Sequence, residues 1–309
     1  MFKDIAIDSF KAIIAWISAL LLVALIGYTL AKTIHNLTNL SYIALIAGFI
    51  MLAVAFYNLK DKNTLYSEHF FIAISFAGQI LILFALFEIS NFFRIDVLIL
   101  LLQTPLIFIF HNKIHKLLNT TFALLALYFT LLYYTHTNIG IFLILTIIIT
   151  ISLHLKNSAY HIVIYSCLVA LAWIILATTT YHFKDLNLNS SILLNTLITL
   201  PLLYLLYKII KHYNLDTKNQ LAIYLVALFT LLLSIYIKDF QVVSTLLILG
   251  FFIGDLVIFS NAVVLTLFVI SNFYYNLDTT LLIKSILLII SGIMLLIVRF
   301  IIQKRYIDG

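Results

Sequence analysis

Long apolar stretches separated by short polar gaps run along the whole chain. A helix that spans a bilayer needs about 20 apolar residues, with a lower limit near ~17. The pattern therefore predicts an all-α polytopic transmembrane bundle. The clear segments lie at residues 12–30, 38–57, 69–88, 92–110, 117–134, 139–155, 162–179, 191–210, 221–237 and 280–302.

The stretch 241–275 leaves the number of spans open. It is too long for one ordinary span and is interrupted by Gly250, Gly254 and Asp255. It forms either one long tilted helix or two short helices that turn at Gly254 and Asp255. The total is therefore eleven or twelve spans.

The Lys and Arg residues decide between these totals, because cytoplasmic loops carry the excess of basic residues. Twelve spans place thirteen of the 18 Lys and Arg residues on the side of the N-terminus and five on the other side. Eleven spans give a weaker division, eleven against seven. The rule favours about twelve spans with both termini cytoplasmic. The five outer residues are then Lys32, Arg94, Lys184, Lys238 and Lys284.

Composition extends this interpretation to the entire chain. Of 309 residues, 64% are hydrophobic and 10% are charged, with mean hydropathy +1.17, whereas soluble chains carry about 25% charged residues. We therefore expect one integral membrane domain over residues 1–309. The net charge of +6 reports orientation rather than nucleic-acid binding. The expected partners are the lipid bilayer and anionic lipids at its cytoplasmic face.

Catalytic chemistry is not indicated. The single cysteine, Cys167, excludes a cysteine-based metal cluster, and no carboxylate lies deep in a clear span. His111 and His115 have helical ligand spacing, but Lys113 and Lys116 beside them repel a cation. We interpret both histidines as solvated side chains in a cytoplasmic turn. The expectation is no enzyme activity, no metal and no cofactor.

Polar side chains inside apolar segments are the candidate functional residues. Gln79 lies near the middle of its segment, and Asn195 shares a segment with Pro201. Gln103, close to Pro105, is a similar exception. A buried amide needs a partner, so Gln79 should face the bundle, where it forms either an interhelical hydrogen bond or a contact with a solute. At Pro201 and Pro105 the alternatives are a helix interruption that exposes backbone groups to a substrate and a simple kink whose freed carbonyl is satisfied by a neighbouring helix.

A further candidate group surrounds Lys284, just inside the last span. Ser285 follows it, and spacings of seven residues place small and polar side chains on one helix face. A lysine at this depth can extend outward to the membrane surface. Because of the polar face, we instead expect Lys284 to point into the bundle and to pair with an outer carboxylate such as Glu88 or Asp278.

Three patches also carry a resemblance. They are Ala15-Trp16-Ile-Ser-Ala19-Leu20, Ala77-Gly78-Gln79 and the more specific Phe273-Tyr274-Tyr275-x-Leu277-x-Thr279-x-Leu281-Leu282-x-Lys284-Ser285. The chain resembles, over its full length, a family of bacterial polytopic inner-membrane proteins described only as a domain of unknown function. The resemblance implies location in the cytoplasmic membrane of a bacterium, and it brings no substrate or catalytic residue.

Three functional hypotheses remain at this point. The first is an integral membrane protein of unknown activity. The second is a permease for a small solute or an ion, which predicts that Gln79, Asn195 and Lys284 line one cavity. The third is a structural or accessory subunit, which predicts a membrane partner or a homo-oligomer.

Overall fold

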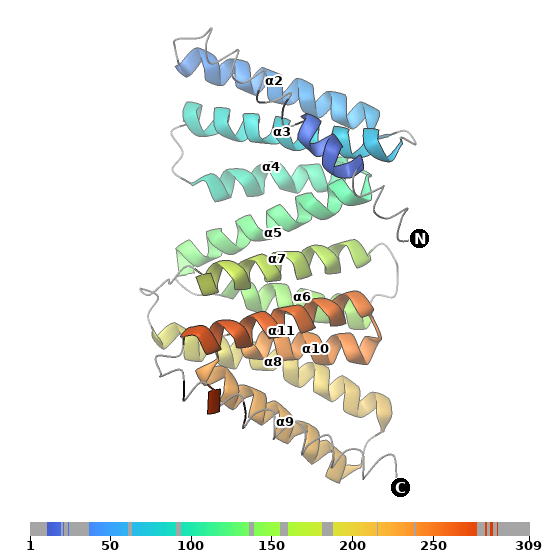
Figure 1. The fold of residues 1–309 in the computed structure, drawn as a ribbon, viewed down its shortest axis with the longest axis vertical. Helices are drawn as coiled ribbons and strands as arrows, with labels where there is room; N and C mark the ends of the chain where they lie inside the picture. Colours follow the sequence, from blue (N-terminus) through green and yellow to red (C-terminus); the bar gives the residue numbers. More distant parts are fainter. Residues whose placement is uncertain are drawn as a thin grey trace. The chain divides into compact units, whose positions relative to one another are not determined.

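The computed structural model describes residues 11–19, 21, 24, 37–60, 64–90, 94–135, 139–154, 160–180, 188–214, 216–237, 239–276, 282, 285, 286 and 289. These residues are helical apart from short turns, and no strand occurs among them, so the predicted all-α class is confirmed. Residues 11–19 are helical and precede α2 (Figure 1). The labelled helices are α2 (Leu37–Asn58), α3 (Leu65–Ser90), α4 (Ile95–Ile109), α5 (Lys113–Thr135), α6 (Ile139–His154), α7 (His161–Thr180), α8 (Leu188–Tyr213), α9 (Thr217–Tyr236), α10 (Phe240–Ile253) and α11 (Leu256–Asn276).

Five of the described helices are long and apolar enough to cross a bilayer. They correspond to α2, α3, α5, α7 and α11. The apolar helices α4, α6 and α10 have 15, 16 and 14 residues. At ~1.5 Å per residue each is shorter than the ~30 Å hydrocarbon core. These lengths identify the chain as a membrane protein and leave the count of twelve spans a prediction.

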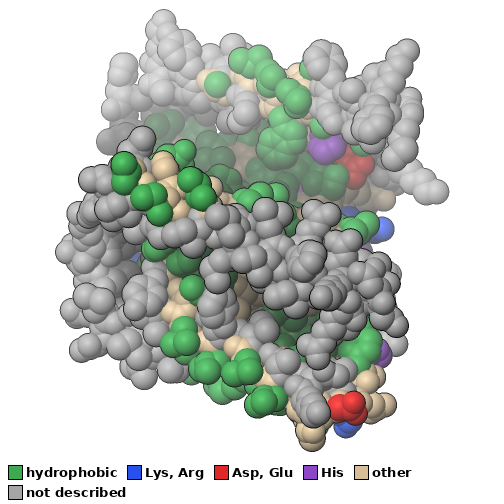
Figure 2. All heavy atoms as spheres, turned by 60° about the horizontal axis from the view of Figure 1, so that its bottom comes forward, with side chains coloured by type: hydrophobic (Ala, Val, Ile, Leu, Met, Phe, Trp, Pro, Cys, Tyr) green, Lys and Arg blue, Asp and Glu red, His purple; other side chains and the backbone are tan. Residues whose placement is uncertain are grey.

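The outward-facing side chains support the same conclusion. Tyr42, Ile46, Phe49 and Ile50 of α2 are all more than half exposed. In Figure 2 the described side chains on the visible face are mostly hydrophobic. Contiguous apolar surface of this kind is unusual on a soluble monomer, and it is what lipid requires.

The stretch 241–275 is divided into two helices. Gly254 ends α10 with φ 75°, in the left-handed region that favours glycine. Asp255 then caps α11, because its Oδ1 accepts hydrogen bonds from the backbone N–H groups of Val257 (2.8 Å) and Ile258 (3.2 Å). This turn is the second of the two alternatives that the sequence allows.

The chain divides into two compact units, residues 1–205 and 206–309, and the division falls within α8. In the first unit α5 packs against α4, α6 and α7, and in the second α10 packs against α9 and α11. The single membrane domain over 1–309 stays a prediction. The candidate site lies within the first unit.

Glycines bring α2 and α3 into close backbone contact. A Cβ atom added to Gly78 would lie 2.8 Å from the carbonyl oxygen of Gly48, and one added to Gly48 would lie 2.7 Å from that of Gly78. Alanines above and below this point, Ala44 and Ala55 on α2 and Ala77 on α3, are buried. Small residues allow membrane helices to approach closely where no hydrophobic effect drives their association. Helix α3 is thus held from one side by α2.

Candidate functional site

Helices α3, α4 and α5 bury a group of uncharged polar side chains that we call the amide network. Residues four apart on a helix share one face, which explains the pairs on α3 and on α5. The five side chains are at most 3% exposed, so their polar atoms depend on one another for hydrogen bonds. The network consists of Ser75 and Gln79 on α3, Gln103 on α4, and His115 and Asn119 on α5.

The hydrogen bonds of the amide network run in one direction. Gln103 Nε2 donates to Gln79 Oε1 at 2.8 Å, and Gln79 Nε2 lies 3.5 Å from Asn119 Oδ1 and 3.4 Å from Ser75 Oγ. Asn119 Nδ2 donates to His115 Nδ1 at 3.0 Å. The proton of the neutral His115 ring is then on Nε2, which donates to Ser75 Oγ at 2.7 Å.

His115 is fully enclosed within the network. Its ring stacks on Phe110 with a centroid distance of 3.8 Å and on Phe76 with 5.3 Å, and the residue is 0% exposed. The interpretation of His115 as a solvated side chain is therefore wrong, whereas His111 is exposed as expected.

His115 was interpreted as solvated because α5 begins earlier than the apolar pattern predicts. The apolar pattern predicts a helix from residue 117, but α5 begins at Lys113 because Asn112 caps it. Asn112 Oδ1 accepts the backbone N–H of His115 at 3.0 Å, and Asn112 Nδ2 donates to Glu68 Oε1 at 2.6 Å. The cap adds a helical turn to α5, and that turn places His115 against α3.

A cavity of about 430 Å³, which we call the amide cavity, lies against the network. Gln79 and Gln103 are its polar lining residues, and Leu83, Ile99 and Phe122 contribute apolar walls. No lining residue is charged. Gln103 Oε1 is buried and has no hydrogen-bond partner among the described residues. The site therefore combines an uncharged, mostly apolar space with a lining residue, Gln103, whose oxygen lacks a hydrogen-bond partner within the described structure.

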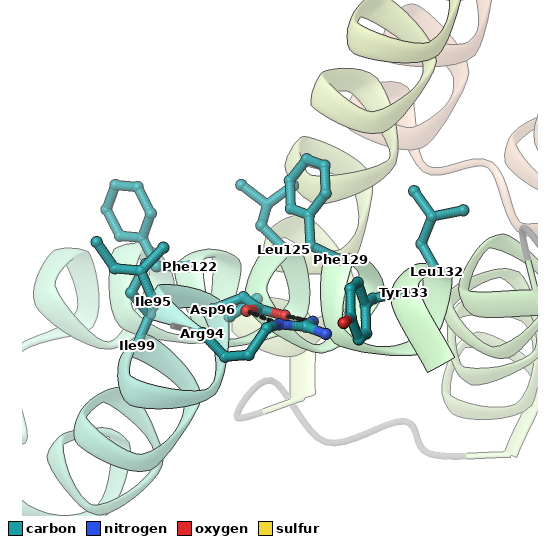
Figure 3. Close-up of a pocket in the computed structure, with 10 residues that line it drawn as sticks. Arg94, Ile95, Asp96, Ile99, Phe122, Leu125, Phe129, Leu132 and Tyr133 are labelled. Atoms are coloured by element: carbon teal, nitrogen blue, oxygen red, sulfur yellow. Dashed lines mark hydrogen bonds and ion pairs between the residues drawn. The ribbon is translucent and has the colours of Figure 1, made fainter. Parts of the chain in front are cut away.

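A second cavity, of about 590 Å³, lies between α4 and α5, and we call it the arginine cavity. Arg94 Nε donates to Asp96 Oδ1 at 2.9 Å, its Nη2 is paired with Asp96 Oδ2, and Thr130 Oγ1 donates to Asp96 Oδ2 at 2.8 Å. The guanidinium carbon lies 3.6 Å from the centre of the Tyr133 ring. Figure 3 shows Arg94 between Asp96 and Tyr133.

Apart from Gln103, the described structure places none of the other predicted site residues beside Gln79. Glu88 is exposed in the last turn of α3, and Ser285 is exposed. The side chain of Asn195 on α8 and the residues Lys284 and Asp278 lie outside the described residues. The predicted pairing of Lys284 with a carboxylate and the shared cavity with Gln79 stay predictions.

The sequence pointed to Gln79 and noted Gln103, but it missed Ser75, His115 and Asn119. The four-residue spacing of polar side chains, Ser75 with Gln79 and His115 with Asn119, could have identified the missed residues from the sequence. Among the described residues, no three His, Cys, Asp or Glu side chains come together as metal ligands. The chemistry of this site is hydrogen bonding by uncharged groups.

One family matches the chain. Residues 5–305 match the family described as Domain of unknown function (DUF4401). Comparison with curated proteins and with solved structures finds no match.

Proposed function

The chain belongs to the DUF4401 family, and from that premise we propose that it passes small uncharged solutes with N–H or O–H donors across the membrane. The observation that carries this proposal is Gln103 Oε1, a buried acceptor at the amide cavity without a hydrogen-bond partner in the described structure. A donor group of the solute completes the hydrogen bonding of Gln103. No covalent step is involved, so the proposal is for a permease rather than an enzyme.

Helix association alone does not account for this arrangement. An interhelical hydrogen bond in a membrane contributes on average about 0.6 kcal/mol, whereas a buried acceptor without a partner costs about 1–3 kcal/mol. Gln79 and Gln103 already form one interhelical bond at 2.8 Å. An apolar residue at position 103 would remove this oxygen but would also leave Gln79 Oε1 without its donor. A hydrogen-bond donor on an occupant of the cavity would satisfy Gln103 Oε1 and keep the bond to Gln79.

The absence of charge on the cavity lining favours an uncharged solute over an ion. An ion that leaves water needs charges or many dipoles around it, because burial of an unpaired charge is strongly unfavourable. The amide cavity offers two side-chain amides and otherwise apolar or aromatic walls. This lining suits a solute with both an apolar surface and a hydrogen-bond donor, such as a short polyol.

The test measures glycerol and urea permeation by stopped-flow light scattering of proteoliposomes. Gln103→Met keeps the approximate shape and removes the hydrogen-bonding groups. We expect it to lower protein-dependent permeability between about twofold and tenfold, the equivalent of about 0.5–1.5 kcal/mol for one net hydrogen bond.

The matched control is Thr104→Val. Thr104 is the next residue of α4, is exposed, and its hydroxyl donates to the backbone oxygen of Leu100 at 2.7 Å. This variant should conduct like the unsubstituted protein. Equal permeability of the Gln103 and Thr104 variants, or no permeability above that of empty liposomes, contradicts the proposal.

We also propose that the chain has twelve spans with both termini cytoplasmic, in the inner membrane of a bacterium, with anionic lipid bound at the basic face. The charge distribution supports this orientation, and the division of 241–275 into α10 and α11 supplies the helix that twelve spans need.

Labelling of the turn between α10 and α11 tests the orientation. Leu256 is 81% exposed and lies next to Asp255 and Gly254, so Leu256→Cys leaves the turn and its cap intact. We expect a membrane-impermeant thiol reagent to modify this cysteine in inverted vesicles and not in intact cells. The parent chain is the control, because its cysteine, Cys167, is buried. Labelling in intact cells contradicts the twelve-span orientation.

A further inference from the structure

The amide cavity and the arginine cavity are neighbours. Both are lined by Ile99 of α4 and Phe122 of α5. Asp96, Ile99 and Gln103 are three and four residues apart, so they lie on one face of α4. Asn119, Phe122, Ala126 and Thr130 follow the same spacing on α5.

Each cavity has one lining residue with a buried polar atom that lacks a hydrogen-bond partner in the described structure, and the two atoms are of opposite kinds. Arg94 Nη1 at the arginine cavity is a buried donor, and Gln103 Oε1 at the amide cavity is a buried acceptor. Within the described part of the chain neither atom has a hydrogen-bond partner. A hydroxyl or amide group of a solute complements both atoms, since it accepts as well as donates.

The positions of Arg94 and Gln103 along the chain decide the order in which a solute meets them. Arg94 precedes Gln103 by nine residues, so their Cα atoms are separated by roughly 14 Å along α4 at ~1.5 Å per residue. A solute of a few carbon atoms is shorter than this backbone separation. It meets Arg94 and Gln103 in succession, and the side chains between them are those that both cavities share.

We propose that the arginine cavity is the entrance of the solute path, and that Ile99 and Phe122 form the constriction that selects solutes by size before Gln103. In Figure 3 these two side chains lie at the opposite end of the lining from Tyr133. Phe122 also contacts the Phe76 ring edge-to-face with a centroid distance of 5.6 Å. That contact fixes one wall of the constriction, whereas Ile99 forms the other.

Arg94 acts at the entrance as a fixed donor rather than as a free charge. Its pairing with Asp96 leaves the cluster without net charge, and Thr130 Oγ1 holds the carboxylate from α5 at 2.8 Å. A lone guanidinium would favour anions. The paired guanidinium instead presents Nη1 to an uncharged acceptor, which agrees with the uncharged lining beyond it.

The inference rests on the proposed function, and two measurements test it. Ile99→Ala should raise the ratio of xylitol to glycerol permeability about tenfold, the scale on which small changes in the volume of a binding cavity alter discrimination. Ile99→Phe should lower the permeability of both solutes. The control is Leu101→Ala, because Leu101 is on the same helix, is 65% exposed and lines neither cavity.

The second measurement does not depend on transport. A membrane-impermeant thiol reagent should modify Ile99→Cys, because the path admits water, and it should leave Leu101→Cys unmodified. Where Ile99→Ala fails to fold, Phe122→Ala replaces it. An unchanged permeability ratio, or an unmodified cysteine at position 99, overturns the proposed constriction. If Gln103→Met still lowers glycerol permeation in that case, the proposed function stands without the constriction. Absence of any protein-dependent permeation overturns both.

Discussion

Gly78→Ala is expected to lower the free energy of unfolding by about 1–3 kcal/mol, the usual cost of overpacking a close contact. The added methyl carbon would lie 2.8 Å from the backbone oxygen of Gly48 and 3.0 Å from Met51 Cβ. A backbone oxygen in a helix cannot rotate away as a side chain can. Helices α2 and α3 must therefore move apart, and their contact with buried alanines on both sides is lost.

Equilibrium unfolding in mild detergent measures this effect. The control is Ala53→Leu, because Ala53 lies on the exposed face of α2 and its larger replacement should change stability by less than about 0.5 kcal/mol. Gly78→Leu should prevent recovery of folded protein. If Gly78→Ala is as stable as Ala53→Leu, the close approach of α2 and α3 is contradicted.

The second large loss of stability is expected on substitution of His115. His115→Leu retains the volume between Phe76 and Phe110 but removes the partner of Asn119 Nδ2 and the shorter of the two hydrogen bonds at Ser75 Oγ. The loss of stability should be at least about 1 kcal/mol, since a buried polar group left without a partner costs about 1–3 kcal/mol.

The chain offers a close control for this change. His111 is exposed and lies one turn before His115 in sequence, so His111→Leu should alter stability by less than about 0.5 kcal/mol. A double-mutant cycle of His115→Leu with Ser75→Ala should give a coupling of about 0.5–3 kcal/mol, as residues in direct contact do. Equal effects of the two histidine substitutions, or additive effects in the cycle, contradict the buried network.

The apolar pattern was sufficient to predict the helical class and most helices, because in lipid every backbone group must find its partner within the helix. The apolar pattern predicted the ends of the helices less well. The start of α5 depends on one asparagine cap, which hydropathy does not register. The turn at Gly254 and Asp255 was recognisable from its residues, but only the structure chose it over one long helix.

The site was only partly predictable for a related reason. A glutamine in an apolar segment must find a partner, so Gln79 could be identified from the sequence. Which residues it meets depends on the rotation of α4 and α5 about their axes, and one sequence does not specify that rotation. His115 was misjudged because the lysines beside it suggested an exposed turn, whereas on a helix Lys113 is exposed and His115 is buried.

The hydrogen bonds of the amide network all run from donor to acceptor in the same direction, and this determines which groups of a solute Gln103 can meet. Each amide donates with its nitrogen and accepts with its oxygen, so a reversal of the Gln103 amide would place its oxygen against the oxygen of Gln79 unless Gln79 also reversed. Asn119 and the tautomer of His115 would have to follow. The five side chains therefore share one orientation, as coupled dipoles do. A molecule that offers only acceptors to Gln103 must reverse the whole set, whereas a donor leaves it as it stands.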